Sequence, residues 1–313
     1  MRLHSFTRVD CHSETECSKR ARGTTLSRIT ARARWALSDH GKAIRLNRLL
    51  RARHRNAGTL IVAYDHPLVH GPIPGTINPT AQIGRFVAAD IDGLLLNPGT
   101  LRHCGDALLT QSPPALILRL DWTSVWRQGP DHPASCDIGK PEDALRLGAD
   151  AVLTFMIVGT GDNAFERDEV ARNARIAREC EKVGLPLIVE TLARGRDVKS
   201  AASPEWLRFH SRVAAELGAD AVKTEYSGDI ESMRTVIEAC PVPILVLGGS
   251  KTDSEDEALD VIRSAMQAGA AGVFFGRNVF QADDVACFLQ RARSALSDFA
   301  QSNSRMKSQA AVD

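Results

Sequence analysis

One lysine stands out among the reactive side chains of this sequence. Only eight of the 39 Lys and Arg residues are lysine, and one of these, Lys223, lies inside the apolar run Ala219–Glu225. If that run is a strand, alternation places Lys223 on the same face as Ala221 and Glu225. Burial removes hydration from an ammonium, which lowers its pKa and yields an amine able to form a Schiff base with a substrate carbonyl. The alternative is a structural salt bridge to Glu225 or another inward acid.

Two glycine-rich segments indicate an anion site. One apolar run ends in Leu247-Gly-Gly-Ser-Lys251, and the last run ends in Phe275-Gly-Arg-Asn278. Glycine lets backbone N–H groups approach an anion, while serine, lysine and arginine add donors and charge. Either segment alone could simply form a turn. Together they predict a phosphate site made by Gly248, Gly249, Ser250, Lys251, Gly276 and Arg277.

Charged side chains also follow three other apolar runs. Asp65 could orient the lysine or handle protons, and His66 could be a general acid/base. Arg119 could hold a second anionic group, and Glu190 could carry protons or pair with Lys223. The alternatives are a turn cap for Asp65, a loop histidine for His66, and structural ion networks for the other two.

Eight apolar runs must position these residues. They are continuous rather than alternating, as expected for parallel strands covered by helices. The runs are Leu60–Tyr64, Gly93–Leu96, Ala115–Leu120, Ala151–Ile157, Pro186–Glu190, Ala219–Glu225, Val242–Leu247 and Ala271–Phe275. Amphipathic stretches separate several of them, at Glu166–Val183, Glu205–Leu217, Asp229–Ala239 and Glu255–Ala268.

This alternation over roughly 250 residues predicts an α/β fold, a (β/α)8 TIM barrel with its chemistry at the carboxyl ends of the strands. A doubly wound sheet is the alternative. It would require a glycine-rich fingerprint after the first run, and Tyr64-Asp-His-Pro-Leu-Val69 offers none.

Composition limits the class of protein and its partners. Hydrophobic residues make up 43% and charged residues 25%, which excludes a disordered chain. The net charge of +1 gives no case for nucleic acid, and no apolar run approaches the roughly 20 residues that span a bilayer. The seven cysteines include no C-x-x-C pair, which indicates a reducing, cytoplasmic location without structural zinc. No His/Asp/Glu cluster has ligand spacing, so no metal is expected.

The chain is expected to have three segments. Residues 1–40 are rich in Arg, Ser and Thr and poor in acids, which predicts a disordered extension. Residues 41–298 hold the predicted barrel as a single domain, and residues 299–313 read as a polar tail.

Several motifs occur in a fixed order between about Gly41 and Leu296. They are Tyr64-Asp-His66, Gly71-Pro-Ile-Pro-Gly75, Leu94-Leu-Leu-Asn-Pro-Gly99, Ala221-Val-Lys-Thr224, Pro241-Val-Pro-Ile244 with Gly248-Gly-Ser-Lys251, and Gly276-Arg-Asn-Val-Phe280. Together they resemble the class I, Schiff-base aldolases of the archaeal-type fructose-bisphosphate aldolase group, a DeoC/FbaB/LacD-like family that includes heptulosonate synthases and autoinducer-2 thiolases.

The resemblance implies roles for matching residues. Lys223 would form the Schiff base, and Asp65 would take part in its chemistry and in substrate binding. Gly249, Ser250, Gly276 and Arg277 would hold a phosphate. It also implies no cofactor beyond the covalent Schiff base, a phosphorylated sugar as substrate, and a homo-oligomer.

One departure from the family pattern affects proton transfer. The aldolases and synthases carry a tyrosine after the fifth strand, where this chain has Leu192, which cannot transfer a proton. The thiolase branch also lacks that tyrosine and is thought to use the histidine matching His66. A smaller change places Pro67 after His66, which stiffens the loop. Proton transfer is therefore expected from His66 or Glu190, with Asp65 as a further possible base.

The predicted function is a Schiff-base aldolase that cleaves or forms a C–C bond in a phosphorylated ketose. One alternative is a thiolase or acyltransferase that acts on a phosphorylated dicarbonyl with coenzyme A as cosubstrate. Another is a transaldol-type synthase. A third, from a different class, is a phosphate-ligand binding barrel without turnover.

Overall fold

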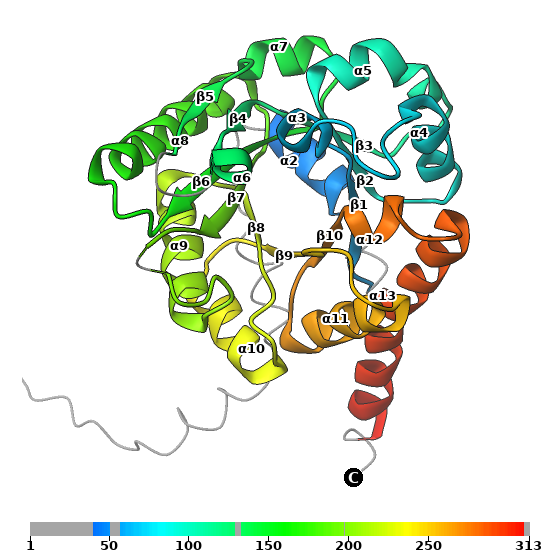
Figure 1. Cartoon of the computed structure of the whole chain (residues 1–313). Coiled ribbons are helices and arrows are strands. Elements are labelled where there is room, and N and C mark those ends of the chain that lie inside the picture. Colours follow the sequence, from blue (N-terminus) through cyan, green and yellow to red (C-terminus); the bar gives the residue numbers. More distant parts are fainter. Residues whose placement is uncertain (1–39, 51–56, 129–132, 197, 310–313) are drawn as a thin grey trace, which may run out of the picture. The chain divides into compact units, whose positions relative to one another are not determined.

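Eight parallel strands close into a barrel, which confirms the predicted fold (Figure 1). The computed structural model describes residues 40–50, 57–128, 133–196 and 198–309. In ring order the strands are β1 Thr59–Ala63, β2 Gly93–Leu96, β3 Ala115–Arg119, β6 Ala151–Val158, β7 Leu187–Ala193, β8 Ala221–Thr224, β9 Ile244–Leu247 and β10 Gly272–Phe275. The ring closes where β10 pairs with β1, with Val273 opposite Leu60.

Helices lie around the strands (Figure 1). The four amphipathic stretches of the sequence are helices α8 Asn163–Val183, α9 Pro204–Leu217, α10 Ile230–Ala239 and α11 Glu255–Ala268. The others are α2 His40–Leu49, α3 Pro67–His70, α4 Pro79–Ala88, α5 Pro98–Cys104, the 3-10 turn η2 Gly105–Leu108, α6 Val125–Gln128, α7 Pro141–Arg146, α12 Arg277–Phe280 and α13 Val285–Gln309. Both α9 and α11 end at a glycine with positive φ, Gly218 at 108° and Gly269 at 103°, which is the geometry that favours glycine at a helix C-terminus.

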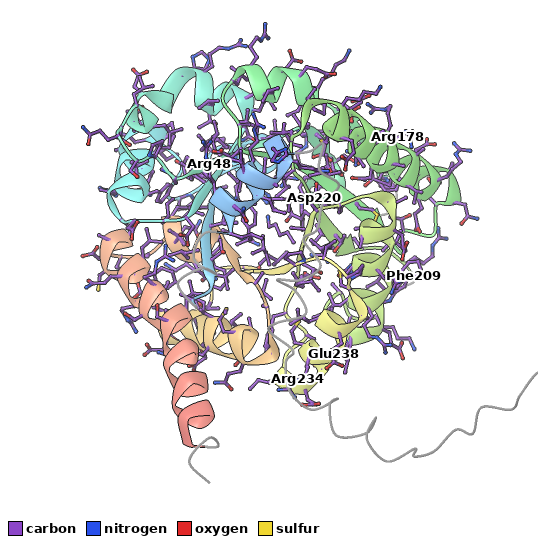
Figure 2. All side chains as sticks on the ribbon, turned by 180° about the vertical axis from the view of Figure 1, so that it is seen from behind. Arg48, Arg178, Phe209, Asp220, Arg234 and Glu238 are labelled. Atoms are coloured by element: carbon purple, nitrogen blue, oxygen red, sulfur yellow. The ribbon has the colours of Figure 1, made fainter. Side chains whose placement is uncertain are left out.

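Side chains of each strand alternate between two apolar clusters. The outward ones, such as Val222 and Val246, pack against the helices. The inward ones, such as Ile117 and Ile188, fill the barrel and reach Leu49 of α2. Helix α2 thus covers the amino-terminal end of the strands, and Figure 2 views the barrel from behind. The carboxyl end of the strands is therefore the end at which a substrate can bind.

Aspartates fix the starts of three strands. Asp92 Oδ2 accepts from the Leu60 amide at 2.8 Å, and Asp220 Oδ2 accepts from the Leu187 amide at 2.9 Å. Asp150 Oδ2 accepts from the Leu116 amide at 3.1 Å. Each aspartate precedes one strand and bonds an amide of the neighbouring strand, and Asp150 and Asp220 each end a Gly-Ala-Asp phrase of the sequence.

The sequence did not predict a short antiparallel hairpin, β4 Asp121–Thr123 and β5 Ser135–Asp137, which follows β3. Helix α13 continues to Gln309, beyond the boundary expected at residue 298. The extension predicted for residues 1–40 lies outside the described residues, which begin at His40.

Candidate active site

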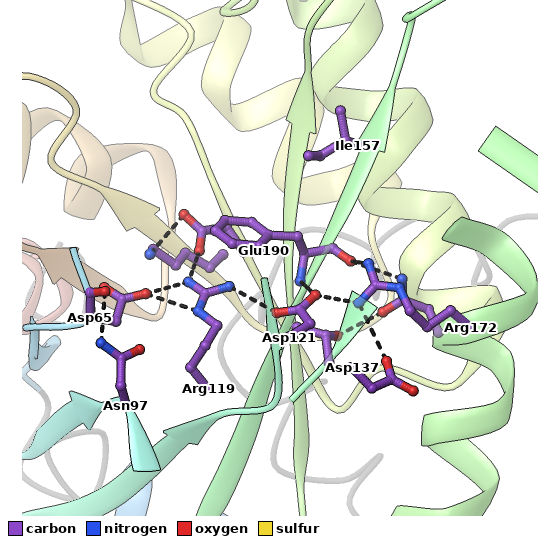
Figure 3. A network of polar contacts seen from close by, with 12 residues as sticks. Asp65, Asn97, Arg119, Asp121, Asp137, Ile157, Arg172 and Glu190 are labelled. Carbon is purple, nitrogen blue, oxygen red and sulfur yellow. Dashed lines mark hydrogen bonds and ion pairs between the residues drawn. The ribbon is translucent and has the colours of Figure 1, made fainter. Parts of the chain in front are cut away.

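A polar layer crosses the barrel interior near the carboxyl ends of the strands (Figure 3). Lys223 Nζ lies 2.8 Å from Glu190 Oε1, and Glu190 Oε2 lies 2.6 Å from Arg119 Nη2. Arg119 in turn donates to Asp65 Oδ2 through Nε at 2.9 Å and Nη2 at 2.5 Å. Four residues that the sequence singled out, from four strand ends, therefore form one chain of ion pairs.

Strand pairing explains why Lys223 meets Glu190. The two residues lie opposite each other in the parallel pair β7–β8, and both point inward. Lys223 is only 4% exposed, and its Nζ lies 4.7 Å from the centre of the Phe274 ring. Glu225, the other candidate partner, instead binds Arg194 at 2.8 Å. The lysine is therefore inside the barrel, next to one carboxylate and one aromatic face.

Arg119 is enclosed by acids rather than open to a substrate. Its side chain is 1% exposed, its guanidinium carbon lies 3.7 Å from the centre of the Phe155 ring, and it contacts Asp65, Glu190 and, at 3.4 Å, Asp121. The sequence suggested that Arg119 holds an anionic group of the substrate. Its surroundings favour a positioning role, because its donors already bind protein carboxylates.

The surrounding cations keep two buried carboxyls ionised. Burial alone would raise the pKa of Asp65, but Arg119, Lys223 and His66 outweigh it and hold that pKa well below its usual range. Burial likewise opposes ionisation of Glu190, while Lys223 and Arg119 lower its pKa. Both groups are thus proton acceptors in their resting state.

His66 lies at the edge of this layer. Its Nδ1 lies 3.4 Å from Asp65 Oδ1 without hydrogen-bond geometry. Its ring packs edge-on against Phe280 with centroids 5.0 Å apart, and it stacks on His70. A Cβ at Gly276 would lie 2.3 Å from His66 Cε1, so only glycine lets the two segments approach this closely.

Asn278 joins the two glycine-rich segments. Its Nδ2 donates to the carbonyls of Gly248 at 2.9 Å and Ser250 at 3.2 Å. The amide of Thr252 donates to Asn278 Oδ1 at 2.9 Å. The loop after β9 is therefore held beside the start of α12, which follows Gly276 directly.

Donors remain available at this junction. Gly249 has φ of 66°, which favours glycine, and Ser250 is exposed. Arg277 is half-buried, burial lowers its pKa, and its Nε has no hydrogen-bond partner. Lys251 Nζ donates to the Gln281 carbonyl. An arginine with a buried, unpartnered Nε beside a glycine turn is suited to a phosphate oxygen.

Polar residues that sequence analysis missed support the layer from outside. Asp121 of β4 is fully buried and accepts from the Phe155 amide at 2.6 Å as well as from Arg119 and Arg172. Arg172, from α8, also binds Glu169 at 2.6 Å. Burial raises the pKa of Glu169 against the opposing effect of Arg172. The one sequence signal for Asp121 is its place directly after the apolar run Ala115–Leu120.

Asn97 ties β2 to the same layer. Its Nδ2 donates to the carbonyl of Asp65 at 2.9 Å (Figure 3). The sequence placed Asn97 in a motif without assigning it a role.

In the described parts of the chain, no group of three or more His, Cys, Asp or Glu residues could hold a metal ion. No described helix is long and apolar enough to cross a membrane.

Fold and site together define a class of enzyme, a barrel lyase with a buried amine at the catalytic end of its strands. The DeoC/LacD aldolase family profile matches residues 59–282, and the chain belongs to this family. It is a class I aldolase, the type that forms a Schiff base with its substrate.

Known relatives include a cleavage enzyme and a synthase. The class 1 fructose-bisphosphate aldolase of Thermoproteus tenax is 35% identical over 248 residues, covering 77% of this chain and 90% of the relative. The 2-amino-4,5-dihydroxy-6-oxo-7-(phosphonooxy)heptanoate synthase of Streptomyces griseus is 34% identical over 238 residues, covering 76% and 84%.

A solved structure of the same fold contains a covalent reaction intermediate. It is an archaeal fructose-1,6-bisphosphate aldolase whose catalytic lysine is covalently bound to the carbinolamine intermediate of the substrate. It is 32% identical, covers 82% of this chain and 99% of its own, and superposes with a TM-score of 0.70.

Proposed function

We propose that this aldolase cleaves or forms a C–C bond in a phosphorylated ketose, with Lys223 as the Schiff-base residue. The observation that carries the proposal is the Lys223 amine, 4% exposed and 2.8 Å from the Glu190 carboxylate, at the end of the barrel where the two glycine-rich loops meet. A buried amine with a proton acceptor in contact is what carbonyl attack requires.

The reaction follows from that geometry. Glu190 takes a proton from Lys223, and the free amine attacks the ketone carbon to give a carbinolamine. Loss of water gives an iminium, which accepts the electron pair when the neighbouring C–C bond breaks and so becomes an enamine. The aldehyde leaves after its hydroxyl proton passes to a base. Protonation of the enamine and hydrolysis then release the second product and restore Lys223.

Two groups divide the proton transfers in this proposal. Glu190 serves the nitrogen, because its Oε1 contacts Lys223 while Arg119 holds its other oxygen. His66 serves the substrate hydroxyl, because it lies at the edge of the polar layer and Leu192, 1% exposed, occupies the position of the family tyrosine. Asp65 holds Arg119 through hydrogen bonds to its Oδ2, and its Oδ1 lies 3.4 Å from His66 Nδ1.

The phosphate is assigned to the junction of the glycine-rich segments. Backbone N–H groups of Gly249, Ser250 and Gly276 would bind its oxygens, and Arg277 and Lys251 would supply charge. Gly248 and Asn278 hold the loop in position.

An assay of retro-aldol cleavage tests the function. Fructose 1,6-bisphosphate and singly phosphorylated ketoses are incubated with the enzyme, and the aldehyde released is measured. Lys223→Met should abolish cleavage of every substrate, whereas the exposed Lys140→Met should retain it. Equal activity of Lys223→Met and wild type would overturn the proposal.

Acyl transfer to coenzyme A is the second candidate. It is favoured by Leu192 in place of the tyrosine together with the retained His66. If C–C cleavage requires coenzyme A, this candidate replaces simple aldol cleavage. The homo-oligomer and the cytoplasmic location stay predictions from the sequence.

A further inference from the structure

Lys223 has an apolar layer directly above it, toward the mouth of the barrel. Strand pairing sets Lys223 beside Glu190 on β7 and Leu245 on β9. Leu192 and Leu247 follow those two residues by two positions, so they point inward one layer nearer the mouth. Ile157 lies opposite Leu192, and Figure 3 shows it set apart from the polar contacts of Arg119.

These residues belong to one cluster. Leu192, Ile157 and Phe165 are buried in it. Three partly buried hydrophobic residues pack against it, namely Trp122, Trp126 and Leu247. Helices α3 and α6, which supply other members, contact each other beside it. The upper wall on this side is thus hydrocarbon and indole, where the family pattern has a tyrosine hydroxyl.

Two arginines near this wall already bind carboxylates. Arg119 is enclosed by three carboxylates. Arg194 binds Glu225 at 2.8 Å and lies 5.2 Å from the centre of a Trp126 ring. A third arginine, Arg127, is exposed and lies 5.9 Å from the centre of the Trp122 ring. Arg277, in the glycine-rich segment after β10, has the Nε without a partner. These charges favour one phosphate on the Arg277 side.

We propose that the half of the substrate on the Leu192 side, which becomes the aldehyde, is apolar and carries no phosphate. This inference rests on the proposed function, because it concerns the partner of the Lys223 enamine. A phosphate against Leu192 and Leu247 would lose its hydration, and the buried Arg119 could not replace it, because carboxylates already bind its donors. An alkyl or aryl group would instead leave water for a matching surface.

The role of the aldehyde half is easiest to follow in the direction that forms the C–C bond. The enamine formed from dihydroxyacetone phosphate and Lys223 attacks the aldehyde carbon, which forms the new C–C bond. The aldehyde oxygen takes one proton, and water hydrolyses the iminium to release a singly phosphorylated product. The water lost in Schiff-base formation is regained, so no further reactant is needed.

The test compares two acceptors with the full chain and dihydroxyacetone phosphate as donor. One acceptor is 3-methylbutanal and the other is glyceraldehyde 3-phosphate. We expect kcat/KM for 3-methylbutanal to be at least about tenfold higher, since removing three or four apolar carbons from water is worth about 0.8 kcal/mol each and tenfold needs about 1.4 kcal/mol. If the wild-type protein prefers the phosphorylated aldehyde, that result by itself overturns the inference.

A variant tests whether Leu192 causes the preference for 3-methylbutanal. Leu192→Asn keeps a similar size but places an amide in the apolar layer. It should lower kcat/KM for 3-methylbutanal about tenfold and change that for glyceraldehyde 3-phosphate far less. Leu109→Asn, the same change at a residue that is 84% exposed, is the control and should alter neither value. Equal losses for both aldehydes would contradict a specificity role for Leu192.

Schiff-base formation is measured separately. Borohydride trapping with dihydroxyacetone phosphate needs no aldehyde. If trapping succeeds but the apolar aldehyde is not preferred, only the inference about the acceptor is wrong. If trapping itself fails, the proposed function is wrong and the inference falls with it.

Discussion

Replacing Glu190 by glutamine isolates the electrostatic control of Lys223. The amide keeps the volume of the side chain but removes its charge. In the native protein that carboxylate contacts Lys223 Nζ at 2.8 Å and Arg119 Nη2 at 2.6 Å, and the residue is 6% exposed. The variant therefore leaves two buried cations with one fewer anion between them.

The size of the effect follows from these two contacts. A buried hydrogen bond to a charged group contributes about 1.5–3 kcal/mol, and Glu190 contacts one cation with each of its oxygens. Breaking the buried pairs should lower the free energy of unfolding by about 3 kcal/mol, because two buried cations lose this anion.

Turnover should fall as well. If Glu190 accepts the proton from the Lys223 nitrogen, kcat should fall by about 10²–10⁴-fold. The assays are steady-state cleavage, borohydride trapping with dihydroxyacetone phosphate, and urea denaturation. Glu231→Gln is the matched control, because its ion pair with Arg234 lies on the exposed surface of α10 and should matter little.

Two results would refute this reasoning. An unchanged free energy of unfolding would mean that the Glu190 charge does not stabilise the two buried cations. A variant with normal kcat would remove Glu190 from proton transfer and leave it a positioning residue.

Three further changes test other parts of the structure. Asp121→Asn should lower the free energy of unfolding by about 3–5 kcal/mol, measured in urea, because it leaves Arg119 and Arg172 short of a fully buried anion; a loss below about 1 kcal/mol would contradict this. Burial and then Arg194 lower the pKa of His210 to about 3, so its neutral form supports the fold above about pH 6.5 and that support is lost as pH falls toward 3, by up to about 1.4 kcal/mol per unit. His210→Leu should flatten this dependence between pH 7 and 5, and an unchanged slope would exclude His210 as its source. Dialysis against a chelator should leave aldol cleavage unchanged, since no described group of His, Cys, Asp or Glu suits a metal, and metal-restored activity would show otherwise.

Much of the fold could be predicted because its signals are local. A continuous apolar run such as Val242–Leu247 contains β9, and the period-two rule placed Lys223 inward without knowledge of its neighbours. The hairpin β4–β5 was missed because each of its strands has three residues and carries Asp or Cys where an apolar run would give the signal.

The partners in the site could not be predicted in the same way. Alternation predicts both Glu190 and Glu225 on the inner face near Lys223, and only the register between β7 and β8 decides that Glu190 is the contact. Arg119 was predicted to hold an anion because two of its three carboxylates, Asp65 and Glu190, come from distant strand ends. Arg172 lies on an amphipathic helix, and only the packing of α8 beside β4 brings it to Asp121.

Reduction of the Schiff base in place tests the central claim most directly. The enzyme is incubated with fructose 1,6-bisphosphate or dihydroxyacetone phosphate, reduced with borohydride, digested and mapped by mass spectrometry. We expect inactivation with one ketose-derived adduct on Lys223, and no adduct in Lys223→Met. No adduct, or an adduct on another lysine, would contradict it and would favour a barrel that binds phosphorylated ligands without this chemistry.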